Sequence, residues 1–120
     1  GIVYPGLNKL NYAGHYWPES IESVVDEDVL SFLEEHLQLL PLTPRQAGYD
    51  VLADTNIDRE GAKALADAAE DAWRAALDKD AVRFGRAFRG SFEAQVRMFP
   101  NMVDQTIRDA IAEHGPNALG

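Results

Sequence analysis

The residues best suited to chemistry lie at positions 11–23, in the run Asn-Tyr-Ala-Gly-His-Tyr-Trp-Pro-Glu-Ser-Ile-Glu-Ser. Aromatic rings beside carboxylates are typical of sugar sites, because a sugar stacks its apolar face on an aromatic ring while its hydroxyls bond to acceptors. The candidate substrate-binding residues are Tyr12, His15, Tyr16, Trp17 and Glu19. The alternative interpretation is a plain β-hairpin whose aromatic rings anchor it to helices, with Glu19 and Glu22 in water.

No other segment carries a recognisable catalytic pattern. The chain has no cysteine, which excludes thiol nucleophiles, zinc–thiolate sites and disulfides. Its histidines, His15, His36 and His114, are far apart and show no metal-ligand spacing. No serine lies in a nucleophile elbow, and neither a P-loop nor a G-x-G-x-x-G motif occurs. We therefore expect no catalytic, metal-binding or cofactor-binding residue in this chain.

The composition is that of one globular domain. With 120 residues, 46% of them hydrophobic, the chain is long enough to form its own core. A net charge of -9 disfavours binding to nucleic acid or to anionic membranes, which requires clusters of Lys and Arg. No apolar run approaches the roughly 18 residues of a membrane span, and the absence of cysteine fits a cytoplasmic protein. Because the first residue is Gly1 rather than Met, we expect a piece of a longer protein.

The hydrophobic pattern predicts an α+β fold in which a β-β-α-β segment is followed by three helices. The first two strands flank a turn at Gly14, and the third is an almost continuous apolar run that we expect to be buried on both faces. The strands are predicted at residues 7–13, 16–25 and 36–42. The helices are predicted at residues 27–35, 57–77, 79–99 and 103–113. Three strands would leave one edge of the sheet open.

Aspartates recur where helices should begin. Asp26 and Asp78 are the predicted N-caps of the first and third helices. Asp50, Asp54 and Asp58 recur every four residues, without the alternate ligand positions and central glycine of a calcium loop. We predict turn and capping roles for these three.

The predicted helix at residues 79–99 is the clearest amphipathic helix in the chain. We expect its apolar side in the core; that side is formed by Phe84, Phe88, Phe92 and Val96. The opposite side, called the arginine face below, consists of Arg83, Arg86, Arg89, Glu93 and Arg97. We predict a solvated face balanced by neighbouring acids, and the alternative is a contact with a phosphate or an acidic partner.

Several runs together resemble one enzyme family. They are Tyr-Pro-Gly-Leu-Asn-Lys-Leu-Asn-Tyr at residues 4–12, Gly-His-Tyr-Trp-Pro-Glu-Ser-Ile-Glu-Ser at 14–23, the apolar run at 37–44, Gly-Tyr-Asp-Val-Leu at 48–52, and the long helices that end at Phe99-Pro100. Nearly the whole chain resembles the C-terminal half of the GHMP kinases, especially the branch near galactokinase and the heptose and fucose kinases.

The resemblance implies both a fold and an activity. The fold is a ferredoxin-like α+β sandwich with a small antiparallel sheet packed on helices, and the activity is transfer of the ATP γ-phosphate to a hydroxyl, often of a sugar, with magnesium. The family's Pro-x-x-x-Gly-x-x-Ser-Ser motif, its catalytic acid and its lysine belong to the other half of the enzyme. Its C-terminal Gly-rich loop and last strand would follow Gly120. The resemblance thus implies a fragment that is inactive alone, lacks its last strand, and leaves ATP and magnesium to the parent kinase.

A second hypothesis comes from a different class of protein. The chain would then be a non-catalytic interaction module that binds a partner through the open sheet edge or the arginine face. The open edge also predicts self-association of the chain.

Overall fold

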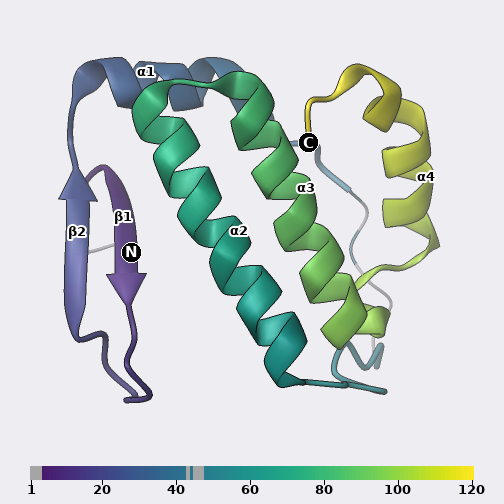
Figure 1. Ribbon diagram of the computed structural model, residues 1–120. Helices are drawn as coiled ribbons and strands as arrows, with labels where there is room; N and C mark the ends of the chain where they lie inside the picture. The colour runs from purple at the N-terminus through teal and green to yellow at the C-terminus, as the bar shows by residue number, and fades with distance from the viewer. Residues whose placement is uncertain (1–3, 43, 45–47) are drawn as a thin grey trace. The chain divides into compact units, whose positions relative to one another are not determined.

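The computed structural model describes residues 4–42, 44 and 48–120 (Figure 1). These residues form an α+β structure with a two-stranded antiparallel sheet and four α-helices, which confirms the predicted α+β class. The chain divides into two compact units, Gly1–Gln38 and Leu39–Gly120, and each is described by itself. In the described ranges, no helix is long and apolar enough to cross a membrane.

The first unit begins with a β-hairpin. Its strands, β1 (Leu7–Asn11) and β2 (Ser20–Val24), pair antiparallel and confirm the first two predicted strands with narrower bounds. Residues 12–19, between the two strands, form an eight-residue loop. Gly14 has a φ of 80° in this loop, a conformation in which glycine is not strained, and so fills the predicted turn position.

Polar side chains fix the register of the hairpin. Three of its directly opposite pairs are polar and bonded: Asn8 with Ser23 at 2.6 Å, Lys9 with Glu22 at 2.9 Å, and Asn11 with Ser20 at 3.1 Å. The other two pairs, Leu7 with Val24 and Leu10 with Ile21, are apolar. A slip of one residue would move every side chain to the opposite face and break all three polar pairs.

Each of the four described α-helices begins after an aspartate. The carboxylates of Asp26, Asp58, Asp80 and Asp104 accept hydrogen bonds from backbone N–H groups in the first turn of the following helix. These caps start α1 (Glu27–His36), α2 (Arg59–Asp78), α3 (Ala81–Met98) and α4 (Gln105–His114). The predicted caps are thus confirmed for α1 and α2. Asp78 was the wrong choice for α3, because it is still the last residue of α2.

The third predicted strand, at residues 36–42, is not formed. His36 instead ends α1, where its Nδ1 lies 2.7 Å from the carbonyl oxygen one turn earlier. The residues that follow have no strand partner in the part of the chain that the structure describes. Leu39 is 100% exposed, so the expected burial on both faces is also wrong. An apolar run becomes a strand only where a neighbour pairs with its backbone groups, and Pro41 has no N–H to offer.

The buried side of α3 differs from the predicted one. It consists of Phe84, Gly85, Ala87, Ala94 and Met98. Phe88 is 50% exposed instead, and Phe92 and Val96 are only half-buried. Each step of four residues advances about 40° around a helix, so a line of such steps turns away from a straight partner. Residues spaced alternately three and four positions apart stay on one side of a helix. On α3 this spacing brings the small residues Ala87 and Ala94 to the buried side.

The turn between α2 and α3 is a Schellman motif with lysine at its left-handed position. Lys79 has φ 55° and ψ 38°, and its N–H donates to the carbonyl oxygen of Ala76 at 3.1 Å. The N–H of Asp80 donates to the carbonyl oxygen of Ala75 at 2.9 Å. Glycine usually occupies this position, because a Cβ is strained in the left-handed region.

Replacement of Lys79 by glycine should therefore stabilise the protein. We expect the free energy of unfolding of Lys79→Gly to exceed that of Lys79→Ala by about 0.5–1 kcal/mol, because both lose the side chain but only glycine relieves the strain. Urea unfolding followed by circular dichroism measures the difference. Equal stabilities of the two variants would contradict backbone strain at this residue.

Candidate functional site

All five predicted substrate-binding residues lie in the loop that joins β1 to β2. The loop closes where the N–H of Glu19 donates to the carbonyl oxygen of Asn11 at 2.8 Å. All five side chains are exposed, with Tyr16 at 87% and Trp17 at 75%.

Two of these five side chains form an aromatic ring contact. The rings of Tyr16 and Trp17 meet edge to face, with centroids 5.1 Å apart and planes at 88°, which is a favourable geometry for aromatic pairs. Among the described residues, no hydrogen bond joins the side chains of Tyr12, His15 and Glu19 to one another. The loop therefore presents one preformed aromatic corner, Tyr16 with Trp17.

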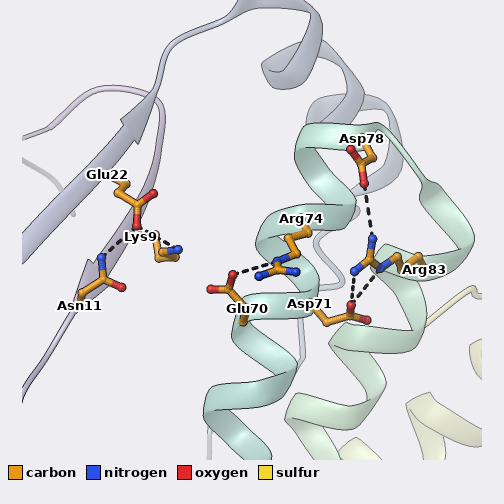
Figure 2. A network of polar contacts seen from close by, with 8 residues as sticks. All are labelled: Lys9, Asn11, Glu22, Glu70, Asp71, Arg74, Asp78 and Arg83. Carbon is orange, nitrogen blue, oxygen red and sulfur yellow. Dashed lines mark hydrogen bonds and ion pairs between the residues drawn. The ribbon is translucent and has the colours of Figure 1, made fainter.

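The sequence prediction missed a polar network at the base of this loop (Figure 2). A carboxylate oxygen of Glu22 lies 2.9 Å from the ammonium of Lys9 and accepts a hydrogen bond from the Asn11 amide at 3.0 Å. The same amide lies 3.1 Å from the hydroxyl of Ser20. We call Lys9, Asn11, Ser20 and Glu22 the Glu22 network. Strand alternation could have found it, since the hairpin register places Lys9 opposite Glu22.

The Glu22 network prepares a charged hydrogen-bond acceptor. The hydrogen bond from Lys9, followed by that from Asn11, lowers the pKa of Glu22 below its ordinary value. Like other exposed glutamates, Glu22 is ionised at neutral pH, where a carboxylate accepts hydrogen bonds and donates none. This suits the binding of a hydroxyl or a cation rather than proton donation. No cluster of three or more His, Asp or Glu residues in the described ranges could hold a metal ion.

The arginine face of α3 is partly occupied by ion pairs to α2. Near the start of α3, Arg83 donates from Nε to Asp71 at 2.8 Å and lies 3.4 Å from Asp78 (Figure 2). Near its end, Arg97 lies 3.1 Å from Asp58 and 3.0 Å from the carboxylate of Glu60. Because α2 and α3 run antiparallel, these ion pairs join the two helices at both ends.

These ion pairs divide the arginine face into two kinds of residue. The prediction of cations balanced by neighbouring acids is confirmed for Arg83 and Arg97. Arg86 and Arg89, between them, are exposed to solvent. An acidic partner would therefore meet two exposed arginines that lie outside these ion pairs, Arg86 and Arg89, rather than all four arginines of the face.

Comparisons with protein-family models, with curated proteins and with solved structures found no match for this chain. The hairpin itself offers an exposed aromatic corner and an ionised carboxylate supported by an amide and an ammonium group. Such a combination suits a polar ligand that also has an apolar face.

Removal of the Lys9 ammonium should raise the pKa of Glu22. In Lys9→Met we expect that pKa to move up towards 4.5, the ordinary value, while the hydrogen bond from Asn11 keeps part of the depression. An NMR titration of the side-chain carboxyl carbon of Glu22 measures it. Lys63→Met, which removes the partner of Asp67 elsewhere in the chain, is the matched control and should leave Glu22 unchanged. An unshifted Glu22 in Lys9→Met would show that Lys9 is not the main cause.

Arg97→Met should weaken the dependence of stability on acid pH. A hydrogen bond from Arg97 lowers the pKa of Glu60, whereas that of Asp58 is lowered first by the N–H of Gly61 and then by the charge of Arg97. A carboxyl with a lowered folded pKa contributes stability above its unfolded pKa, and that contribution is lost as the pH falls through the folded value. The ordinary values are 4.5 for Glu60 and 3.8 for Asp58, so this loss begins near pH 4.5.

Thermal unfolding between pH 7 and pH 3 tests this linkage. We expect the melting temperature of the wild type to fall more steeply below pH 4.5 than that of Arg97→Met. Arg86→Met removes an exposed arginine from the same helix and should keep the steeper profile. Parallel profiles for the wild type and Arg97→Met would contradict the role of this ion pair.

Proposed function

We propose that this chain is part of a GHMP-type kinase that phosphorylates a sugar hydroxyl, and that the β1–β2 loop contacts the sugar. The resemblance of residues 4–12 and 14–23 to the C-terminal half of these kinases supports the proposal. In such an enzyme the chain would belong to a ferredoxin-like domain. ATP and magnesium would be held by the parent kinase, because no phosphate-binding motif occurs in this sequence.

The observation that carries the proposal is that one short hairpin combines exposed aromatic rings with an ionised carboxylate. Tyr16 and Trp17 form an exposed corner on which the apolar face of a sugar can stack. Asn11 links this loop to the Glu22 network, since its carbonyl oxygen closes the loop while its amide donates to Glu22. Stacking and hydroxyl recognition are therefore available within one element.

The contribution of this chain to catalysis would be positioning. Phosphoryl transfer requires the attacking hydroxyl to lie in line with the γ-phosphate, and a misplaced hydroxyl loses much of the rate. A loop that binds the sugar ring on one side would fix its orientation. The groups that stabilise charge on the phosphate would come from the other half of the kinase.

The alternative is a non-catalytic interaction module, and one observation favours it. In the described part of the chain, β1 and β2 pair only with each other, so each has an edge without a strand partner. Edges of this kind can take an additional strand from another chain. A partner bound there, or self-association, would not require the aromatic corner.

Binding of sugars to this chain separates the two proposals. Calorimetric titration with neutral hexoses and heptoses should give measurable binding, and Trp17→Ala should weaken it about 3–10-fold, the value of one aromatic stacking contact. Phe88→Ala is the matched control, because it removes another half-exposed ring and should leave the affinity unchanged.

Two outcomes of this titration would contradict the kinase proposal. An affinity for the sugar that is unaltered in Trp17→Ala would show that the sugar does not bind at the aromatic corner. Binding of ATP with magnesium to this chain would contradict the assignment of the nucleotide site to the other half of the enzyme. Dimers detected by light scattering would favour the interaction module.

A further inference from the structure

The end of the described chain lies against α3 at a glycine (Figure 1). Gly85 is buried in α3, and a Cβ placed on it would lie 2.5 Å from the backbone carbonyl carbon and oxygen of Leu119. The contact is reciprocal, since a Cβ on Gly120 would lie 2.7 Å from the carbonyl carbon of Gly85. Backbone atoms cannot yield as a flexible side chain can, so only glycine fits this contact on either side.

The helix before this contact is weakly packed. α4 buries no residue of its own, and Ile111 on its apolar side is 47% exposed. Its firm attachments lie beyond its two ends: Val103, 7% exposed, precedes it, and the contact with Gly85 follows it. Segments with few buried apolar contacts open at a lower free energy than the rest of a protein.

The chain between α3 and α4 has the backbone of a hinge. Phe99 leaves the helix with φ -130° and ψ 71°, a 3-10 turn (Pro100–Met102) follows, and Val103 is extended. A few residues outside regular helix are sufficient to absorb the rotation of a whole element.

We propose that α4 is a flap on the α2–α3 pair: it pivots at the buried Val103, the last residue of the irregular segment 99–103, and the contact of Leu119 and Gly120 with Gly85 is its latch. The latch depends on backbone fit rather than on an inserted side chain, because Leu119 is 54% exposed. One added methyl group at the latch is therefore enough to release the flap while α2 and α3 stay folded. This inference does not depend on the proposed kinase function.

A matched pair of glycine substitutions in α3 tests the latch. Gly85→Ala places a methyl group in the latch, whereas Gly90→Ala makes the same change where the nearest atom, Cβ of Ala68, would lie 3.9 Å away. Both substitutions replace glycine by alanine within α3, so they raise the helix propensity by the same amount. We expect hydrogen exchange at residues 105–114 to become at least about tenfold faster in Gly85→Ala and to stay unchanged in Gly90→Ala, with α2 as protected as before in both.

A substitution outside α3 makes the test independent of effects on that helix. Gly120→Ala also places a methyl group against the backbone of Gly85 and should accelerate exchange in α4 to the same extent. Hydrogen exchange in α4 should be no faster in the double variant Gly85→Ala/Gly120→Ala than in either single variant, because both substitutions disrupt the same contact. Exchange in α4 that is equal in Gly85→Ala, Gly120→Ala and Gly90→Ala would overturn the proposal.

Discussion

The unit from Leu39 to Gly120 depends on how closely α2 and α3 can approach each other. Their buried positions are held mainly by small residues, Ala75 and Ala76 on α2 and Ala87 and Ala94 on α3. Small side chains bring two backbones close together and so extend van der Waals contact along the pair. They also supply little apolar area individually, which leaves this pair dependent on other interactions for its alignment.

Charge and turn geometry supply that alignment. The ion pairs of Arg83 and Arg97 hold α2 at opposite ends of α3. The Schellman turn at Lys79 reverses the chain between α2 and α3, and its left-handed lysine indicates that packing rather than local preference enforces this reversal. The same close approach recurs at Gly85, where the absence of a side chain lets a second backbone lie on α3.

The first unit follows a different principle, since its hairpin is held by complementary polar pairs. Because Lys9 and Asn11 both serve Glu22, the interactions that set the strand register also set the charge beside the aromatic loop. The side chains that fix the hairpin register therefore also hold the carboxylate that the proposed sugar contact would use. All five candidate residues lie in the loop between β1 and β2, where the adjacent Tyr16 and Trp17 form a ring contact through local geometry.

The sequence by itself determined the local features of this protein. Aspartate caps, glycine at the loop turn and helical periodicity act over a few residues, so all four described helices are found close to their predicted bounds, and the two hairpin strands are found within narrower bounds than predicted. Tertiary structure alone decided which side of α3 is buried, because the choice between Phe88 and Ala87 depends on the partner helix. It also decided that residues 36–42 do not form a strand, since an apolar run becomes a strand only when a neighbouring strand pairs with it. The contact at Gly85 was equally unpredictable, because it joins residues more than thirty positions apart through backbone atoms that no side-chain pattern encodes.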